Sequence, residues 1–400
     1  MKHALEVSIV LATHNRRNVV LHTLSRLADC GLRSGEYEII VVDNASADGT
    51  ADELRGHPEV RVVQLEENLG SCAKSAGVEH ARGRLVLFLD DDSFPRPGCL
   101  ARMLTHFAEQ PRLGAAGFTV HLPDGSQECS ALPHVFVGCG AGLRAEALRE
   151  VGGLDQSFFM QAEEYDLSFR LLQAGWRVEI FADLQVDHLK SPTARRSERT
   201  TFYDIRNNLR LIARYLPDPQ ADIYQADWTQ RYRWLAQRAG HQTAFERGLA
   251  EGRHLAAAER PAFESRRLCP PILEQLFCWS LIEERMLRLR EDGVRRIVLA
   301  DLGKNVYPFY RGAATAGLDV LALADDRLAV PGRDYRGVPL LSTSEALSAP
   351  ADAIVVSNTS YVHAQRRAQE LRRQSDLPVH AWFMAPGQFA ASPHPAAMHA

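Results

Sequence analysis

The chain has 400 residues, of which 46% are hydrophobic and 24% are charged, and its formal net charge is −4. These values are typical of a globular protein with two or three domains, and they argue against bulk binding to nucleic acid. The seven cysteines form no CxxC pair. Because the first residues lack an apolar signal region and no apolar run approaches about 20 residues, we expect neither a signal peptide nor a transmembrane segment. We therefore expect a cytoplasmic protein with reduced thiols.

Strand and helix patterns alternate along the first 90 residues. Helices separate four predicted buried strands: Val7–Ala12, Tyr37–Asp43, Val60–Leu65 and Leu85–Leu89. This alternation predicts an α/β fold with a doubly wound, mainly parallel sheet, whose ligand site lies at the carboxyl ends of the strands. Thr13, Asp43, Asn68 and the acidic triplet Asp90–Asp92 all lie at such ends, so we expect them to share one site.

The acidic triplet directly follows the strand at Leu85–Leu89. Three adjacent carboxylates repel one another unless a cation lies among them. Asp90 and Asp92 have the same side-chain parity, so both can point at one ion, and carboxylate oxygens suit Mg²⁺ or Mn²⁺. A solvated acidic loop or a helix cap before Pro95 is the alternative interpretation.

A second group of acids opens an amphipathic helix further along the chain. Glu163 and Asp166 are three residues apart on one side of it, whereas Glu164 points about 100° away. One of them can act as a general base near the metal site, or the three can simply interact favourably with the helix dipole. His188 follows a predicted strand, where a histidine more often packs than binds a ligand.

These motifs together resemble those of the inverting glycosyltransferases of family 2, which have the GT-A fold. The resemblance covers about residues 7–215 and rests on seven segments: Thr13–Arg16, Val42–Ser46, Asn68–Gly70, Asp90–Asp92, Gly152–Asp155, Glu163–Arg170 and Tyr203–Asn207. It implies metal-dependent transfer of a sugar from a nucleoside diphosphate sugar to an acceptor hydroxyl, with inversion. The acceptor is then a glycan, a lipid-linked molecule or a small molecule.

The resemblance also implies roles for individual residues. Asp43 accepts the imide N–H of uracil or thymine, so the donor is a UDP- or dTDP-sugar. The other expected nucleotide-binding residues are Thr13, Asn15, Arg16, Asn68, Gly70, Lys74, Asp90 and Asp91. The Mn²⁺ or Mg²⁺ ion is expected on Asp92, Asp90 and His188. Glu164 holds the position of the catalytic base, but Asp is commoner there, so Glu163 and Asp166 stay alternatives.

The rest of the chain suggests two further parts beyond a glycosyltransferase domain at residues 1–215. Residues 216–292 are predicted to be a helical connecting segment, and residues 293–388 a smaller Rossmann-like α/β domain. This domain lacks GxGxxG and has only Gly303 in its phosphate turn, so packing or dimerisation is favoured over dinucleotide binding. Residues 389–400 are predicted to be a disordered tail.

We therefore expect a glycosyltransferase, in bacterial surface-glycan or other glycoconjugate synthesis. One alternative is a sugar-1-phosphate nucleotidyltransferase, but the loop Ala12–Arg16 lacks the glycines that such an enzyme would need. Another is a non-catalytic sugar-nucleotide-binding or scaffold protein. The intact acidic triplet and the acidic helix start argue against this alternative. Two further possibilities are peripheral contact with the inner face of the membrane and formation of a homodimer.

Overall fold

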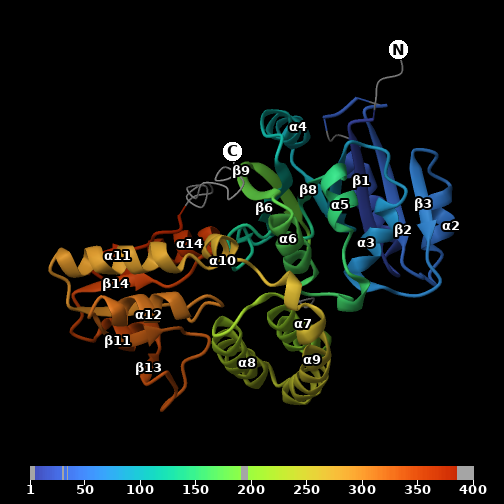
Figure 1. The fold of residues 1–400 in the computed structure, drawn as a ribbon. Coiled ribbons are helices and arrows are strands. Elements are labelled where there is room, and N and C mark those ends of the chain that lie inside the picture. The colour runs from blue at the N-terminus through green and yellow to red at the C-terminus, as the bar shows by residue number, and fades with distance from the viewer. Residues whose placement is uncertain (1–4, 29–30, 34, 191–196, 385–400) are drawn as a thin grey trace. The chain divides into compact units, whose positions relative to one another are not determined.

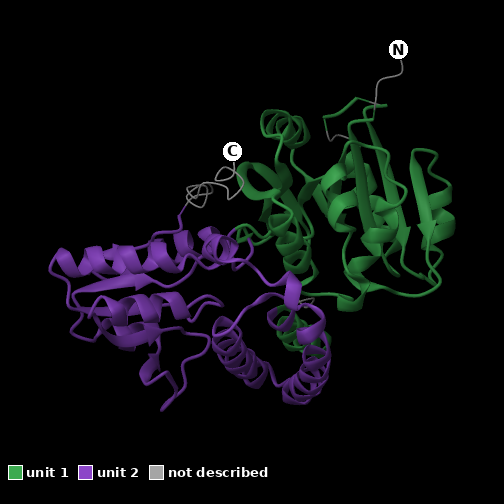
Figure 2. Ribbon diagram, viewed as in Figure 1, with its two compact units in different colours: residues 1–128, 134–211, 396–400 green, residues 129–133, 212–395 purple. Residues whose placement is uncertain are grey.

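The structure is a computed structural model that describes residues 5–28, 31–33, 35–190 and 197–384. Contacts divide the chain into two compact units, and the described residues of 1–128 and 134–211 form the first (Figure 2). Residues 129–133 and those from 212 onward form the second. The predicted disordered tail, residues 389–400, lies outside the described residues. In the part of the chain that the structure describes, no helix is long and apolar enough to cross a membrane.

The first unit is built on a nine-stranded mixed sheet (Figure 1). The strands run in the order β3-β2-β1-β4-β8-β6-β9-β5, with β7 paired to β6. β1 to β4 are parallel, as are β6 and β9, whereas β8 runs antiparallel between β4 and β6. The strands are β1 (Val7–Thr13), β2 (Tyr37–Asp43), β3 (Val60–Gln64), β4 (Leu85–Asp90), β5 (Ser93–Pro95), β6 (Leu113–His121), β7 (Gln127–Glu128), β8 (Ala141–Arg144) and β9 (Arg177–His188).

Helices cover both faces of this sheet. Because side chains alternate along a strand, Val7, Ile9 and Leu11 of β1 pack with helices α1 and α4 on one face. Gly77 of α3 approaches the other face so closely that a Cβ would lie 2.5 Å from Val10. The helices are α1 (Arg17–Leu27), α2 (Thr50–Arg55), α3 (Lys74–Val78), α4 (Cys99–Glu109), α5 (Ala145–Val151), α6 (Glu163–Gln173) and α7 (Glu198–Tyr215). This doubly covered sheet confirms the predicted fold class.

Strand register explains why distant polar residues share one edge of the sheet. β1 pairs in parallel with both β2 and β4, so that Thr13 lies opposite Asp43 and Ala12 lies opposite Asp90. All three strands therefore end at the same level. The short β5, directly after the acidic triplet, then pairs with the end of β9, and Ser93 lies opposite His188. This pairing brings His188 to the triplet.

The second unit contains the expected helices and a second sheet. The strands run in the order β12-β13-β11-β10-β14-β15, and every pair except β12 with β13 is parallel. Helices α8 (Gln220–Ala239), α9 (Gln242–Ala262), α10 (Pro270–Phe277) and α11 (Trp279–Glu291) precede β10 (Arg296–Ala300). The later elements are α12 (Tyr307–Thr315), β11 (Asp319–Ala324), β12 (Asp334–Tyr335), β13 (Val338–Leu341), α13 (Thr343–Leu347), β14 (Ala353–Val356), α14 (Tyr361–Gln374) and β15 (Val379–His380).

The carboxyl end of β10 is filled by the protein's own charges. Asp301 is paired with Arg367, whose Nε lies 3.0 Å from its carboxylate, and it accepts a hydrogen bond of 3.2 Å from Asn358. A dinucleotide-binding sheet would place its pyrophosphate near such a strand end. The Asp301 carboxylate there disfavours a phosphate, and the packing role stays our prediction. The Rossmann-like interpretation itself stays a prediction.

Candidate functional site

A cavity of about 550 Å³ lies at the carboxyl ends of β1 and β4 in the first unit. Most of the residues predicted from the sequence line it: Thr13, Arg16, Asn68, Gly70, Lys74, Asp90, Asp91, Asp92, Glu163, Glu164 and His188. Asn15, Asp43 and Asp166 are not among the lining residues. The convergence inferred from strand ends is thus present in the structure, over segments up to about 180 residues apart in the sequence.

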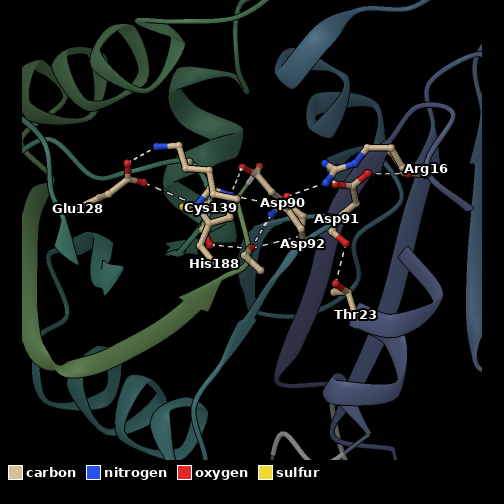
Figure 3. A network of polar contacts seen from close by, with 12 residues as sticks. Arg16, Thr23, Asp90, Asp91, Asp92, Glu128, Cys139 and His188 are labelled. Atoms are coloured by element: carbon tan, nitrogen blue, oxygen red, sulfur yellow. Dashed lines mark hydrogen bonds and ion pairs between the residues drawn. The ribbon is translucent and has the colours of Figure 1, made fainter. Parts of the chain in front are cut away.

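Arg16 ties two members of the acidic triplet to the loop after β1 (Figure 3). Its guanidinium lies 2.5 Å from Oδ1 of Asp91 and 2.8 Å from Oδ2 of Asp92. Thr13 donates a hydrogen bond of 2.7 Å to Asp91, and Thr23 donates one to the backbone carbonyl of Asp91. Burial raises the pKa of Asp91 to about 6, despite the opposing effects of Arg16 and Thr13. Asp91 therefore has its oxygens engaged inside the protein.

Asp90 and Asp92 face the cavity with other partners. The ammonium of Lys74 lies 2.5 Å from Oδ1 of Asp90 and donates to the carbonyl of Gly138 at 2.9 Å. Nε2 of His188 lies 3.1 Å from Oδ1 of Asp92 and 3.9 Å from Oδ2 of Asp90. Burial alone would raise the pKa of Asp92, but the hydrogen bonds and charges of His188 and Arg16 lower it to about 2. The protein's own cations therefore compensate the triplet.

The donors around His188 fit a divalent ion. One ligand atom each from Asp90, Cys139 and His188 lie within 4.8 Å of one another, and Oδ1 of Asp92 lies 3.1 Å from Nε2 of His188. The imidazole is buried, and its Nδ1 makes no hydrogen bond among the described residues but lies 3.7 Å from Oε2 of Glu128. Carboxylates with an imidazole suit Mn²⁺ or Mg²⁺, whereas the buried Cys139, which belongs to the same cluster, is a softer donor.

Asp43 lies opposite Thr13 at the strand end, outside the cavity lining, and has unused hydrogen-bonding capacity. Its side chain is completely buried at the end of β2, and its Oδ2 accepts from the backbone N–H of Ser46 at 3.3 Å. Its Oδ1 has no hydrogen-bond partner within the described part of the chain. A buried carboxylate oxygen is costly when it is unpartnered, so this atom is suited to a ligand N–H.

Asn15 has a structural place in the loop after β1. Its backbone N–H donates to Oγ of Ser46 at 2.9 Å, and its side-chain oxygen accepts from the N–H of Ala47 at 2.7 Å. These bonds fasten the loop after β1 to the loop after β2, and the Asn15 side chain is exposed. Asn15 therefore shapes the cavity indirectly.

Asn44 organises the segment that follows β3. Its side chain donates to Oδ1 of Asn68 at 3.0 Å and to the carbonyl of Gly70 at 2.9 Å. Gly70 has a φ of +64°, and a Cβ at this position would lie 2.1 Å from the carbonyl oxygen of Phe159. Only glycine fits both requirements. The predicted residues Asn68 and Gly70 thus lie at the cavity and also carry its framework.

The three acids at the start of α6 have different surroundings. Asp166 is buried and paired with Arg170, whose guanidinium lies 2.7 Å away. Glu163 is also buried; it accepts a short hydrogen bond from Ser71, and its Oε2 has no hydrogen-bond partner among the described residues. Burial, reinforced by Glu164, raises the pKa of Glu163 well above its usual value. Glu164 is half-buried and makes no hydrogen bond or ion pair within the described ranges, so its carboxylate is available in the cavity.

The sequence analysis missed several residues that line the cavity. They are His14, Asn44, Ser71, Cys139, Phe159, Met160, Gln161, Lys190, Arg199 and Thr200. His14 and Asn44 lie inside segments of the family resemblance, and most of the others lie next to such a segment. This position is the only signal that the sequence offers. Glu128 likewise enters the network by pairing with Lys190 (Figure 3).

Two family models match adjoining parts of the chain. Residues 8–136 match Glycosyl transferase family 2, and residues 116–243 match Glycosyl transferase family group 2. The matched region includes every strand and helix that forms the cavity. This region belongs to the family 2 glycosyltransferases, as the resemblance predicts.

Individual relatives match over shorter stretches. A protein named for teichuronic acid biosynthesis, glycosyltransferase TuaG of Bacillus subtilis, is 30% identical in an alignment of 153 residues that covers 33% of this chain and 59% of that protein. The pre-mycofactocin glycosyltransferase of Mycobacterium tuberculosis is 28% identical over 43% of this chain and 40% of its own length. The chain thus spans less than two thirds of either relative.

A solved structure with a similar arrangement is the mannosyltransferase PcManGT of Pyrobaculum calidifontis, in complex with GDP-Man and Mn²⁺. The TM-score is 0.46 at 20% sequence identity, with coverage of 66% of this chain and 80% of that one.

Proposed function

We propose that this protein transfers a sugar from a UDP- or dTDP-sugar to an acceptor hydroxyl, with inversion and with a divalent metal ion. The observation that carries the proposal is one cavity holding two separate acidic groups. Asp90 and His188, which form a metal-type cluster with Cys139, are one group together with the neighbouring Asp92, and Glu164, whose carboxylate is unpaired among the described residues, is the other. Such a division suits chemistry in which one group supports the leaving diphosphate and another removes a proton.

The donor would be held by the strand-end residues. Thr13 and Arg16 line the cavity itself. Asp43 lies outside the lining, and its unpartnered Oδ1 would accept the imide N–H of a base that reaches this buried carboxylate. Asp90, Asp92 and His188 would hold the Mn²⁺ or Mg²⁺ ion. When bound, the ion offsets the negative charge that develops on the departing diphosphate.

Glu164 would act on the acceptor. It accepts the proton of the acceptor hydroxyl as the oxygen bonds to the anomeric carbon, while the bond from that carbon to the diphosphate oxygen breaks. Attack and departure on opposite faces invert the configuration in one step. Glu163 and Asp166 suit the role less well, because Ser71 holds one carboxylate and Arg170 the other.

A role in bacterial surface-glycan synthesis is supported only by relatives, such as TuaG, whose name refers to teichuronic acid biosynthesis. The organisation into a glycosyltransferase domain at residues 1–215, a helical segment and a Rossmann-like domain also remains our proposal.

The test is hydrolysis and transfer with a panel of UDP-, dTDP- and GDP-sugars, with and without Mn²⁺. We expect metal-dependent turnover of a pyrimidine nucleotide sugar, and its loss in Asp92→Asn. Release of pyrophosphate from a nucleoside triphosphate and a sugar-1-phosphate would instead identify a nucleotidyltransferase. Nucleotide binding without turnover of any donor would indicate a non-catalytic protein.

A further inference from the structure

The segment that leads into α6 is backbone-strained and lines the cavity. Phe159, Gln161 and Ala162 have φ values of 65°, 68° and 70°, which side-chain-bearing residues rarely adopt. Phe159, Met160 and Gln161 line the cavity immediately before Glu163 and Glu164. The conformation of this segment therefore sets where the acids lie, and it persists only if the surroundings hold it.

One side chain from a distant helix supplies much of that hold. Asn207 of α7 is completely buried. Its Nδ2 lies 2.9 Å from the carbonyl oxygen of Phe158, 2.7 Å from that of Met160 and 2.8 Å from that of Gln161. These three carbonyls belong to a segment outside regular secondary structure, so no helix or strand ladder supplies their hydrogen bonds. They share the two hydrogens of the Asn207 amide instead.

The orientation of that amide is fixed by its neighbour. Arg206 donates from its guanidinium to Oδ1 of Asn207 at 2.8 Å, so the amide nitrogen is turned toward the segment. Arg210 adds a bond of 2.8 Å to the carbonyl of Ser157, one residue before the strained stretch. On the opposite side, Ser71 donates to the carbonyl of Phe159 at 3.2 Å.

We propose that Asn207 is a positioning residue, which holds residues 158–162 in the conformation that places Glu164 in the cavity. This role rests on the proposed function, because it serves the carboxylate that takes the acceptor proton. Asn207 is buried behind the segment and touches no reacting atom. Its removal should therefore affect the transfer step and leave nucleotide binding intact.

The test uses two variants of the full chain, Asn207→Ala and Asn207→Asp. Asn207→Asp preserves the shape of the side chain but presents a carboxylate, which cannot donate, to the three carbonyls. The matched control is Asn208→Ala, since Asn208 is also buried on α7 but donates to its own helix at Asp204. Hydrogen exchange of a peptide covering residues 157–164 should accelerate in both Asn207 variants and not in the control. Circular dichroism and melting confirm that each variant is folded.

With an active donor, kcat should fall about 10- to 100-fold, the scale of a misplaced catalytic group, while the Kd for UDP with Mn²⁺ stays within about twofold. Unchanged exchange of residues 157–164 in folded Asn207→Ala would overturn the clamp. Faster exchange with unchanged kcat would overturn its link to transfer. If no donor is turned over, the proposed function fails, yet the exchange measurement still decides whether Asn207 holds the segment.

Discussion

The ammonium of Lys74 lies 2.5 Å from Oδ1 of Asp90 and is almost fully buried. Burial alone would lower the pKa of Lys74, but the adjacent Asp90 carboxylate more than offsets this and raises it. Without any metal, Asp90 therefore already has a cation of the protein beside it. A metal ion bound to Asp90 must share the carboxylate with Lys74.

This sharing gives a first prediction, for Lys74→Met. Asp90 loses its cation and Gly138 loses its donor, so we expect the free energy of unfolding to fall by about 1–3 kcal/mol, since Asp90 stays partly exposed. Mn²⁺ should then raise the melting temperature more in the variant than in the wild type. Arg55→Met, which breaks the exposed pair with Asp52, is the control. An equal Mn²⁺ shift in all three proteins would contradict the idea that Lys74 and the metal share Asp90.

A second prediction concerns the metal ligands. Loss of a residue that merely supports a metal ligand typically costs about 10- to 100-fold in affinity or activity. Because we propose Asp92 as a ligand itself, Asp92→Asn should weaken Mn²⁺ binding and lower turnover at least about 100-fold. Calorimetry with Mn²⁺ and a donor assay measure the two effects. Asp187→Asn is the control, because Asp187 adjoins His188 in sequence but pairs with Arg96. Near-wild-type Mn²⁺ affinity in Asp92→Asn would rule out Asp92 as a ligand.

A third prediction concerns the nucleotide. Asp43→Ala removes the unpartnered Oδ1 and should weaken UDP or dTDP by about 1–3 kcal/mol, the scale of a hydrogen bond to a charged group. Calorimetry with UDP, dTDP and GDP measures it, and Asp52→Ala on the exposed side of α2 is the control. Equal UDP affinity in Asp43→Ala and the wild type, or tighter binding of GDP, would exclude the predicted base pocket.

The sequence predicted the part of the site in which acidic residues directly follow apolar strands. Continuous apolar strands ending in Asp43 and Asp90 predict both the sheet and its functional edge, because parallel strands end together. The side chains that contact each acid could not be predicted in this way. Nothing in the spacing of Glu163, Glu164 and Asp166 reveals that Arg170 lies against Asp166 or that Ser71 reaches Glu163. Cys139 and Asn207 depend likewise on contacts between segments far apart in the chain.

The surroundings of those three acids give the fourth prediction, which concerns the base. Glu164→Gln should lower kcat by about 10²–10⁴-fold, the usual effect of removing a general base, with little change in nucleotide or Mn²⁺ affinity. Glu164 makes no hydrogen bond or ion pair among the described residues, so the melting temperature of Glu164→Gln should equal that of the wild type. Single-turnover transfer and calorimetry separate the two effects.

Asp166→Asn is the matched comparison, because it changes a carboxylate of the same helix in a different environment. It weakens a largely buried ion pair with Arg170, which also binds the carbonyls of Val151, Gly152 and Gly153. We therefore expect a loss of about 1–3 kcal/mol in the free energy of unfolding and a smaller effect on kcat. Normal transfer by Glu164→Gln together with none by folded Asp166→Asn would move the base to Asp166. If Glu163→Gln and both other variants all stay active, the base lies outside α6.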